Sequence, residues 1–210
     1  MALQLELLGD ILVKKILEDL KDEAIKMLAD ASFLSTFTTH DESIDRELWS
    51  KGAAYSIVPF ELEMSGVTPS KMSQKVPVNK KNAHRHCYVG SCIDRIEVYN
   101  SKGEVHEVER FLHLENRVYA LSTNRHAENL WLKIAEYSSE GSVIRSCRVD
   151  NDSEFWSFAY DWELRGLKEI TSFSSNSVPG VKVYPEYNAG FELQGMYFLN
   201  ADSKVYVYRC

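Results

Sequence analysis

The sequence lacks any long apolar run. Nowhere do about 18 apolar residues follow one another, although a helix needs roughly that many to cross a bilayer. Glu6 and Asp10 interrupt the apolar N-terminus, and no small-residue cleavage site follows them, so a secretory signal is not expected. The sequence therefore predicts a protein that makes no membrane contact and is located in the cytoplasm.

Cysteine is scarce as well. The four cysteines, Cys87, Cys92, Cys147 and Cys210, are scattered along 210 residues, whereas disulfide-stabilised domains are short and dense in cysteine. A chain of this length can bury a core without such cross-links. Reduced thiols and a cytoplasmic location are the simpler expectation.

Basic residues are outnumbered by acidic ones. Lys and Arg total 24 against 31 Asp and Glu, which gives a net charge of −7. Proteins whose main task is to bind nucleic acid usually present a basic face, so nucleic acid is not expected as the principal partner. A negative net charge instead favours encounter with a basic partner.

The motifs of several enzyme classes are missing. The sequence contains neither G-x-G-x-x-G nor G-x-x-x-x-G-K-[ST], whose backbone amides hold phosphates. His126 and Glu128 match the H-x-E of zinc deaminases, but the P-C-x-x-C that supplies their other ligands does not follow. We predict no catalytic residue and no cofactor.

The densest group of potential metal ligands is His84, His86, Cys87 and Cys92. On a strand, the two histidines point to one side and Cys87 points to the other. Structural zinc needs four converging ligands, usually as two pairs well apart in sequence, and here the second pair is missing. We predict no metal site, with these four residues as the weak candidates.

Two pairs of carboxylates have the spacing that places both members on one strand face. They are Glu61 with Glu63 and Glu107 with Glu109, an arrangement used by some glycosyl-transferring enzymes. The neighbouring arginine and serine signals of such enzymes are absent, and carboxylates are usually exposed. We therefore predict that these four side chains are solvated.

The chain divides into three predicted segments: a helical N-terminal segment over 1–66 that packs on a sheet, a basic loop or linker over 67–85, and an antiparallel β-meander domain over 86–210. Apolar residues at three- and four-residue spacings predict a helix over 3–31, and Leu12, Ile16 and Leu20 belong to its apolar stripe. A Thr39–Glu42 capping box predicts a second helix that ends near Gly52.

The loop over 67–85 is the one basic stretch. It has two prolines, no apolar periodicity and no acidic residue, which is typical of a solvated connector. Contact with phosphates is the alternative, although the loop lacks the interleaved aromatic rings of single-strand binders. Its basic residues are Lys71, Lys75, Lys80, Lys81 and Arg85.

From residue 86 onward, apolar and polar residues alternate between clusters of turn-forming residues, which predicts short antiparallel strands. The fold class is therefore α+β, with N-terminal helices followed by a long antiparallel β-meander that closes as a barrel or forms two layers. The predicted strands lie near 87–99, 104–113, 117–123, 129–137, 143–149, 154–163, 167–174, 181–187, 191–199 and 204–209.

The segment from Glu154 to Leu164 alternates most clearly. One face carries Trp156, Phe158, Tyr160, Trp162 and Leu164, and its four aromatic side chains are predicted to form the core. The opposite face carries carboxylates that stay hydrated and available to a cationic partner. The predicted partner-binding residues are Asp150, Asp152, Asp161 and Glu163.

An acidic, β-rich sequence without catalytic motifs resembles, in its general profile, many stoichiometric protein-binding proteins, among them bacterial toxin-neutralising immunity proteins. This resemblance implies a non-enzymatic inhibitor whose partner is another protein, and the charge favours a basic one. The alternatives are a β-barrel that binds a small molecule and an enzyme, such as a hydrolase or nuclease, whose site is dispersed in sequence. The oligomeric state stays open.

Overall fold

The computed structural model describes residues 2–37, 43–164, 166–175 and 177–210, and side chains from residue 10 onward except at 177–179. The helices are α1 (Ala2–Ala29), α2 (Ala31–Ser35) and α3 (Glu61–Met64). The strands are β1 (Arg46–Ser50), β2 (His84–Val89), β3 (Cys92–Tyr99), β4 (Val105–Leu114), β5 (Arg117–Asn124), β6 (Asn129–Tyr137), β7 (Val143–Asp150), β8 (Phe155–Glu163), β9 (Gly166–Ser174), β10 (Ser177–Tyr187), β11 (Leu193–Asn200) and β12 (Ser203–Arg209).

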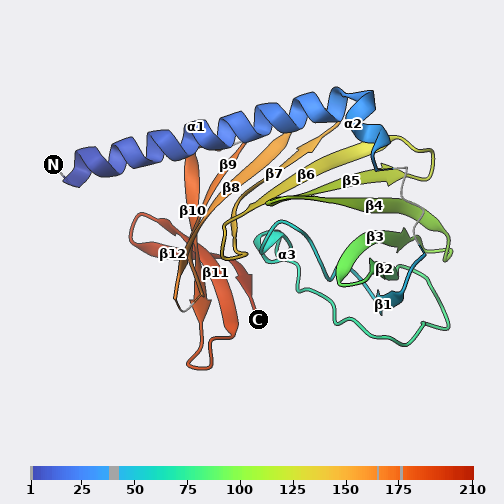
Figure 1. The fold of residues 1–210 in the computed structure, drawn as a ribbon. Helices are drawn as coiled ribbons and strands as arrows, with labels where there is room; N and C mark the ends of the chain where they lie inside the picture. Colours follow the sequence, from blue (N-terminus) through green and yellow to red (C-terminus); the bar gives the residue numbers. More distant parts are fainter. Residues whose placement is uncertain (1, 38–42, 165, 176) are drawn as a thin grey trace.

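The strands form one 12-stranded sheet in which neighbours in sequence are neighbours in space. Each described pair is antiparallel, so the predicted α+β meander is confirmed. In the described residues β1 and β12 do not pair with each other, and the predicted alternative of a closed barrel is wrong. The open sheet curls, with α1 across its convex face and α3 inside the concave face (Figure 1).

Two local predictions are wrong. The stretch predicted as one strand over 87–99 is a hairpin of β2 and β3, which turns at Gly90 with a φ of 57°, a conformation that glycine adopts without strain. The predicted second helix is replaced by β1, in which Leu48 pairs with His86. The buried Trp49 ring, which packs 5.6 Å from Tyr99, favours this strand. The predicted cap, 39–42, lies outside the described residues.

Helix α1 covers the convex face of β6, β7 and β8. Its side chains Leu17, Leu20 and Ala24 are buried, and the last two join the apolar cluster that holds Leu132 and Ile134 of β6. Ser157 of β8 donates to Leu17 O at 3.5 Å on the same face. Helix α1 therefore packs on the sheet through these residues.

The N-terminal half of α1 extends beyond β6, β7 and β8, the strands that the rest of the helix covers (Figure 1). Leu12, predicted to lie on the buried stripe, is 60% exposed, and Ile11 is 58% exposed. The prediction that Leu12 lies on the buried stripe is therefore wrong.

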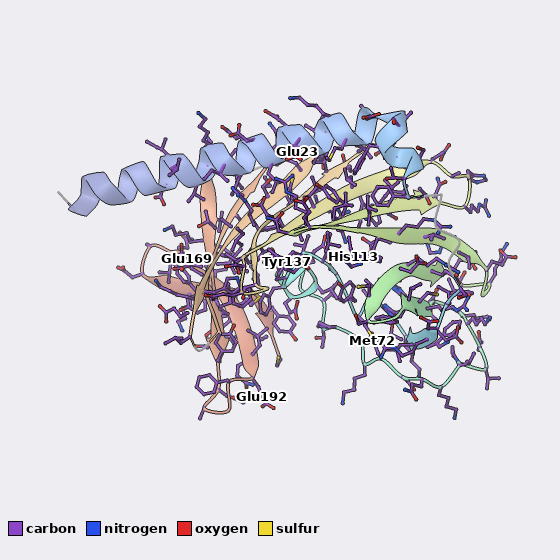
Figure 2. All side chains as sticks on the ribbon, in the orientation of Figure 1. Glu23, Met72, His113, Tyr137, Glu169 and Glu192 are labelled. Atoms are coloured by element: carbon purple, nitrogen blue, oxygen red, sulfur yellow. The ribbon has the colours of Figure 1, made fainter. Side chains whose placement is uncertain are left out.

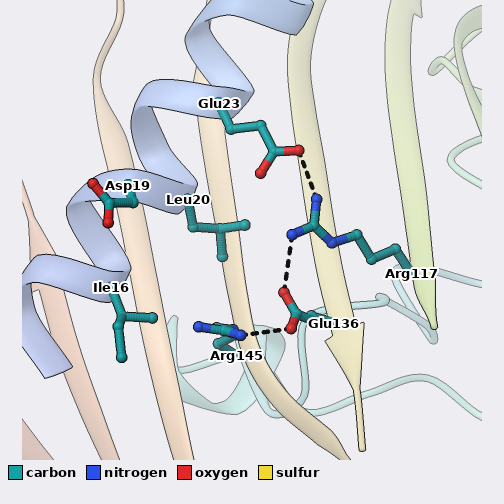
Figure 3. Close-up of a pocket in the computed structure, with 7 residues that line it drawn as sticks. All are labelled: Ile16, Asp19, Leu20, Glu23, Arg117, Glu136 and Arg145. Atoms are coloured by element: carbon teal, nitrogen blue, oxygen red, sulfur yellow. Dashed lines mark hydrogen bonds and ion pairs between the residues drawn. The ribbon is translucent and has the colours of Figure 1, made fainter.

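An ion-pair chain fixes α1 to the convex face (Figure 3). Glu23 of α1 lies 2.6 Å from Arg117 Nη1, whose Nη2 lies 3.2 Å from Glu136. Glu136 also pairs with Arg145 at 2.6 Å. Burial alone would raise the pKa of Glu136, but the two guanidinium groups lower it below its ordinary value, so the carboxylate stays ionised between them.

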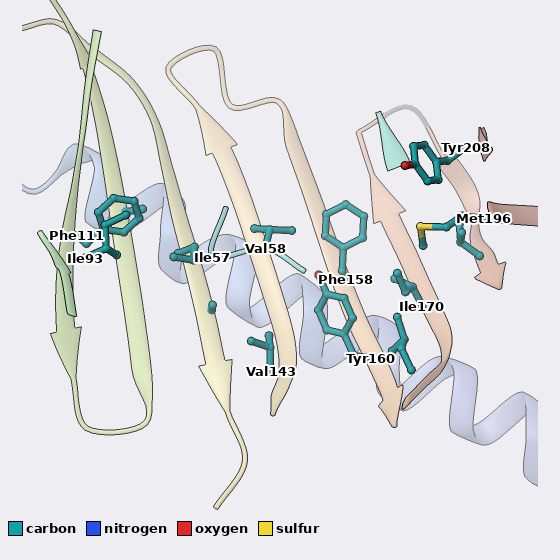
Figure 4. Packing of buried hydrophobic residues seen from close by; sticks show 14 of the residues in the cluster. Ile57, Val58, Ile93, Phe111, Val143, Phe158, Tyr160, Ile170, Met196 and Tyr208 are labelled. Atoms are coloured by element: carbon teal, nitrogen blue, oxygen red, sulfur yellow. The ribbon is translucent and has the colours of Figure 1, made fainter. Parts of the chain in front are cut away.

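The concave face carries the larger apolar cluster (Figure 4). Ile57 and Val58, from the segment between β1 and α3, pack with Phe158 and Tyr160 of β8. The predicted core residues Phe158 and Tyr160 are each 7% exposed, which confirms them as core. Other members of the cluster are Ile93, Ile96, Phe111, Ala120, Ala135, Val143, Leu167, Ile170, Val183, Met196 and Tyr208.

Toward its end, β8 leaves the core. Trp162 is 36% exposed, so the prediction that it lies in the core is wrong, and Leu164 beyond it is 108% exposed. The register with β9 shifts between Asp161 and Trp162, and such a bulge bends the strand. Trp162 then lies over the strand edge and donates to Val143 O at 2.6 Å.

The loop that precedes β2 is tied back to the sheet. Trp49 N donates to Ser73 O at 2.7 Å, Ser73 N donates to Trp49 O at 2.8 Å, and Ser70 N donates to Ala53 O at 2.9 Å. Side chains fill the space inside the curled sheet, and Met72 lies on the loop below β1 to β3 (Figure 2).

The division of the chain into three segments at residues 66 and 85 remains a prediction. No helix in the described part of the chain is long and apolar enough to cross a membrane.

Candidate functional site

The structure separates the four predicted partner-binding carboxylates into two pairs. Asp150 and Asp152 lie at the turn between β7 and β8, where Asp150 Oδ1 accepts from the backbone N of Asp152 and of Glu154. Asp161 and Glu163 lie at the other end of β8. At about 3.3 Å per strand residue, the two pairs are roughly 25–30 Å apart.

Asp161 and Glu163 are the more open pair. Their side chains are 58% and 63% exposed, and Lys168 Nζ lies 3.1 Å from Asp161 and 3.6 Å from Glu163. Asp161 lies on the convex face, because it alternates with the buried Tyr160 of the concave cluster. The Asp150 carboxylate is already hydrogen-bonded within its turn. The end of β8 that carries Asp161 is therefore the better candidate for a partner-binding surface.

A row of tyrosines continues from this carboxylate pair across the convex face. Asp161 pairs in register with Glu169 of β9, and burial and the neighbouring Glu169 raise the pKa of Tyr184 of β10. Tyr184 is opposite Tyr197 of β11, which is opposite Tyr206 of β12. We call Asp161, Glu169, Tyr184, Tyr197 and Tyr206 the tyrosine row.

The rings of the row contact one another and remain partly open to solvent. Ring centroids lie 5.6 Å apart for Tyr184 and Tyr197, and 5.7 Å apart for Tyr197 and Tyr206. All three side chains are half-buried. Figure 1 shows β11 and β12 bending away from α1, so the helix that covers the middle of the convex face does not cover these strands.

Two cations and one carboxylate flank the rings. Lys204 Nζ lies 4.1 Å from the Tyr197 ring centroid, and the Arg209 guanidinium lies 3.7 Å from that of Tyr206. Glu186 accepts from both Lys204 and Tyr206 at 2.8 Å. These contacts hold the rings in fixed orientations, which reduces the side-chain entropy that would be lost on binding.

A buried ionic cluster lies on the concave face. Lys133 Nζ of β6 lies 2.8 Å from Glu61 of α3 and 3.1 Å from Glu109 of β4, and Glu61 also pairs with Arg148 at 3.3 Å. Ser56 donates a short hydrogen bond to Glu61. Arg148 lies 4.6 Å from the Trp131 ring centroid.

The sequence predicts that Glu61 and Glu109 are solvated, and for these two carboxylates the prediction is wrong. Glu109 is 7% exposed and Glu61 lies on α3, not on a strand. Burial would raise the pKa of Glu61, but the Lys133 charge lowers it below the ordinary value. Burial would likewise lower the pKa of Lys133, and the charges of Glu109 and Glu61 raise it. The groups neutralise one another, so the cluster ties α3 to β4 and β6.

Glu107 lies beside this cluster and pairs with no cation among the described residues. Its carboxylate accepts from Ser122 at 2.8 Å, and burial raises its pKa. Within the described residues no histidine or cysteine is paired with it, and the hydroxyl that it binds is that of Ser122. The salt bridges of the neighbouring cluster tie the strands of the concave face to α3.

The weak metal candidates do not converge. His86 is fully buried, and its Nε2 lies 3.0 Å from Ser50 Oγ, whereas Cys87 is buried and Cys92 exposed. Burial lowers the pKa of His86 to about 4 and raises that of the Cys87 thiol to about 11. In the residues that the structure describes, no group of three or more His, Cys, Asp or Glu could hold a metal ion.

The basic loop residues have three different environments. Lys80 lies 5.3 Å from the Trp49 ring centroid and 5.5 Å from that of Tyr99. Arg85 belongs to β2 and pairs with Glu47 at 2.6 Å and with Glu97 at 3.2 Å. Three residues, Lys71, Lys75 and Lys81, line a pocket beneath the loop.

Comparisons with known proteins add no relative. No protein-family model matches the chain, and no curated protein is similar to it. The description of the site therefore rests on the geometry of this chain alone.

Proposed function

We propose that this chain is a non-enzymatic protein-binding protein whose convex face over β8 to β12 contacts the partner. The tyrosine row supports this proposal most strongly. Tyrosine and arginine are enriched in the residues that contribute most to protein interfaces, and here Tyr184, Tyr197 and Tyr206 form one half-exposed surface beside Arg209.

The chemistry of the partner follows from the charge beside the row. Asp161 and Glu163 are exposed at its β8 end, and the chain carries a net charge of −7. Opposite charge speeds the encounter of two proteins, so the proposed partner is a basic protein. Four strand spacings of about 4.8 Å place Asp161 and Tyr206 roughly 19 Å apart, a span that fits a protein interface of ordinary size.

The more specific proposal is a stoichiometric inhibitor that acts in the bacterial cytoplasm, as toxin-neutralising immunity proteins do. It is supported by the acidic charge, by four unpaired thiols and by the aromatic surface. A toxin gene directly beside the gene for this chain is the expected genomic context. A neighbourhood of biosynthetic genes would instead favour a small-molecule ligand and contradict this form of the proposal.

Affinity capture from the source cells tests the proposal. The wild-type chain is expected to recover one basic protein in a stoichiometric amount, and Tyr197→Ala with Tyr206→Ala to weaken that complex by about tenfold or more, or 1.4 kcal/mol. Tyr197→Phe keeps the ring and is expected to retain binding. Unchanged capture by the double alanine variant, with an unchanged melting temperature, would refute this face as the interface.

The carboxylate end of the row is tested separately. Asp161→Lys with Glu163→Lys reverses two exposed charges and is expected to leave the fold intact while it slows association. Glu115→Lys with Glu140→Lys makes the same charge change at two other turns and serves as the matched control. Equal loss of association rate in both variants would show that net charge, and not this surface, attracts the partner.

A further inference from the structure

A pocket of about 930 Å³ lies between the end of β1 and the loop before β2. Its size falls in the range of small-molecule sites, roughly 300–1,000 Å³. Four lysines line it: Lys51 follows β1, and Lys71, Lys75 and Lys81 lie on the loop. No Asp or Glu is among its lining residues, although acidic residues outnumber basic ones in the whole chain.

The four pocket lysines have no carboxylate partner in the described part of the chain. None of them forms an ion pair there, whereas six of the ten lysines elsewhere lie within 4.0 Å of a carboxylate. The paired lysines are Lys14, Lys21, Lys133, Lys168, Lys182 and Lys204. Four unneutralised ammonium groups around one hollow repel one another, and an anion between them would remove that repulsion.

The loop holds this arrangement in place. Ser73 exchanges two backbone hydrogen bonds with Trp49, at 2.7 and 2.8 Å, in the middle of the stretch that carries Lys71 and Lys75. Asn79 Oδ1 accepts from Lys81 N at 2.9 Å. The loop lysines thus extend from a backbone that is hydrogen-bonded to the end of β1.

We propose that this pocket binds a small, multiply charged phosphate compound, with the lysines as its phosphate ligands. Lysine is a common phosphate binder that acts as a point charge, and several phosphates in one compound match several lysines. A nucleic acid strand fits less well, because strand binders stack bases on open aromatic rings. The aromatic lining residue Trp49 is 4% exposed and lies beneath Lys80.

Calorimetric titration of the full chain with tripolyphosphate at low ionic strength tests the proposal. One saturable site is expected, and Lys71→Gln with Lys75→Gln should weaken it by about tenfold or more. The matched control is Lys15→Gln with Lys26→Gln, which removes the same charge from α1 and should change the affinity by less than about twofold. Tripolyphosphate should also slow proteolysis at Lys75.

Three results would overturn the proposal. They are no saturable binding of tripolyphosphate at millimolar concentration, an equal loss of affinity in the pocket and control variants, and binding of a single-stranded RNA oligonucleotide without binding of tripolyphosphate. The proposed protein interface on β8 to β12 involves other residues, so each proposal can fail without the other.

Discussion

Replacement of Lys133 by methionine is the sharpest test of the buried ionic cluster. Methionine keeps most of the side-chain volume, so the change removes a charge and leaves little cavity. Glu61 would keep Arg148 at 3.3 Å, but Glu109 would lose the cation 3.1 Å away and has no other ion-pair partner in the described residues. A 7%-exposed carboxylate would then be uncompensated.

Loss of one partner from a buried ion pair costs about 3–5 kcal/mol. We expect Lys133→Met to lower the free energy of unfolding by that amount, measured by urea denaturation followed through tryptophan fluorescence. Adding Glu109→Gln to Lys133→Met removes the stranded charge and should restore part of the loss. Lys168→Met, which breaks a pair whose side chains are 54% and 58% exposed, should cost much less, because water screens exposed ion pairs.

The difference in unfolding free energy between the wild type and Lys133→Met should decrease as the pH falls. In the wild type the pKa of Glu61 is lowered, so its contribution is present above about pH 4.5 and is lost as the pH falls through the lowered value. Lys133→Met removes the charge that lowers the pKa of Glu61. The gap between wild type and variant should therefore shrink from pH 7 to pH 4. A Lys133→Met loss equal to that of Lys168→Met at pH 7 would refute the structural role of the cluster.

Three further predictions concern the core, the loop and metals. Phe158→Ala, at a site 7% exposed, should cost about 3–5 kcal/mol in urea denaturation, and a loss below about 1 kcal/mol would remove it from the core. Trypsin should cut first within the exposed stretch at Lys75, Lys80 or Lys81, and first cuts after residue 129 would contradict the fold. Dialysis against a chelator should leave the melting temperature unchanged, since His84, His86, Cys87 and Cys92 do not converge. A fall of many degrees would contradict this.

Alternation and turn residues predict most of the meander. The stretch predicted over 129–137 is β6, Asn129–Tyr137, and later strands begin and end close to their predicted limits. The hairpin of β2 and β3 was predicted as one strand, because a single glycine at position 90 is a weak turn signal. The strand β1 depends on pairing with β2, about 40 residues away, and local periodicity does not reveal such pairing.

Burial was harder to predict than secondary structure. If one face of the sheet were exposed to solvent, Glu109 would be exposed as well. Instead, α1 packs on the convex face and the segment before α3 packs on the concave face. The sequence gives no direct sign of this second cover. Lys133 lies between apolar residues on its strand, and this pattern is a sequence signal for a buried cation.

The tyrosine row was missed for a related reason. Tyr184, Tyr197 and Tyr206 lie on three strands, and only the register places them side by side. The density of tyrosine in the last part of the chain was a visible signal of an aromatic surface. Asp161 and Glu163 were predicted from alternation alone, and the structure places them at the end of this row, although their role in binding remains a prediction.

Site-specific photocrosslinking in the source cells tests the proposed interface most directly. A photoreactive aromatic residue in place of Tyr197 should crosslink one basic polypeptide in good yield. The same residue in place of Leu114, which is 47% exposed at the end of β4, should not crosslink it. Absence of a crosslink from position 197, or equal capture of the same polypeptide from both positions, would contradict the assignment of the convex face of β8 to β12 as the partner-binding surface.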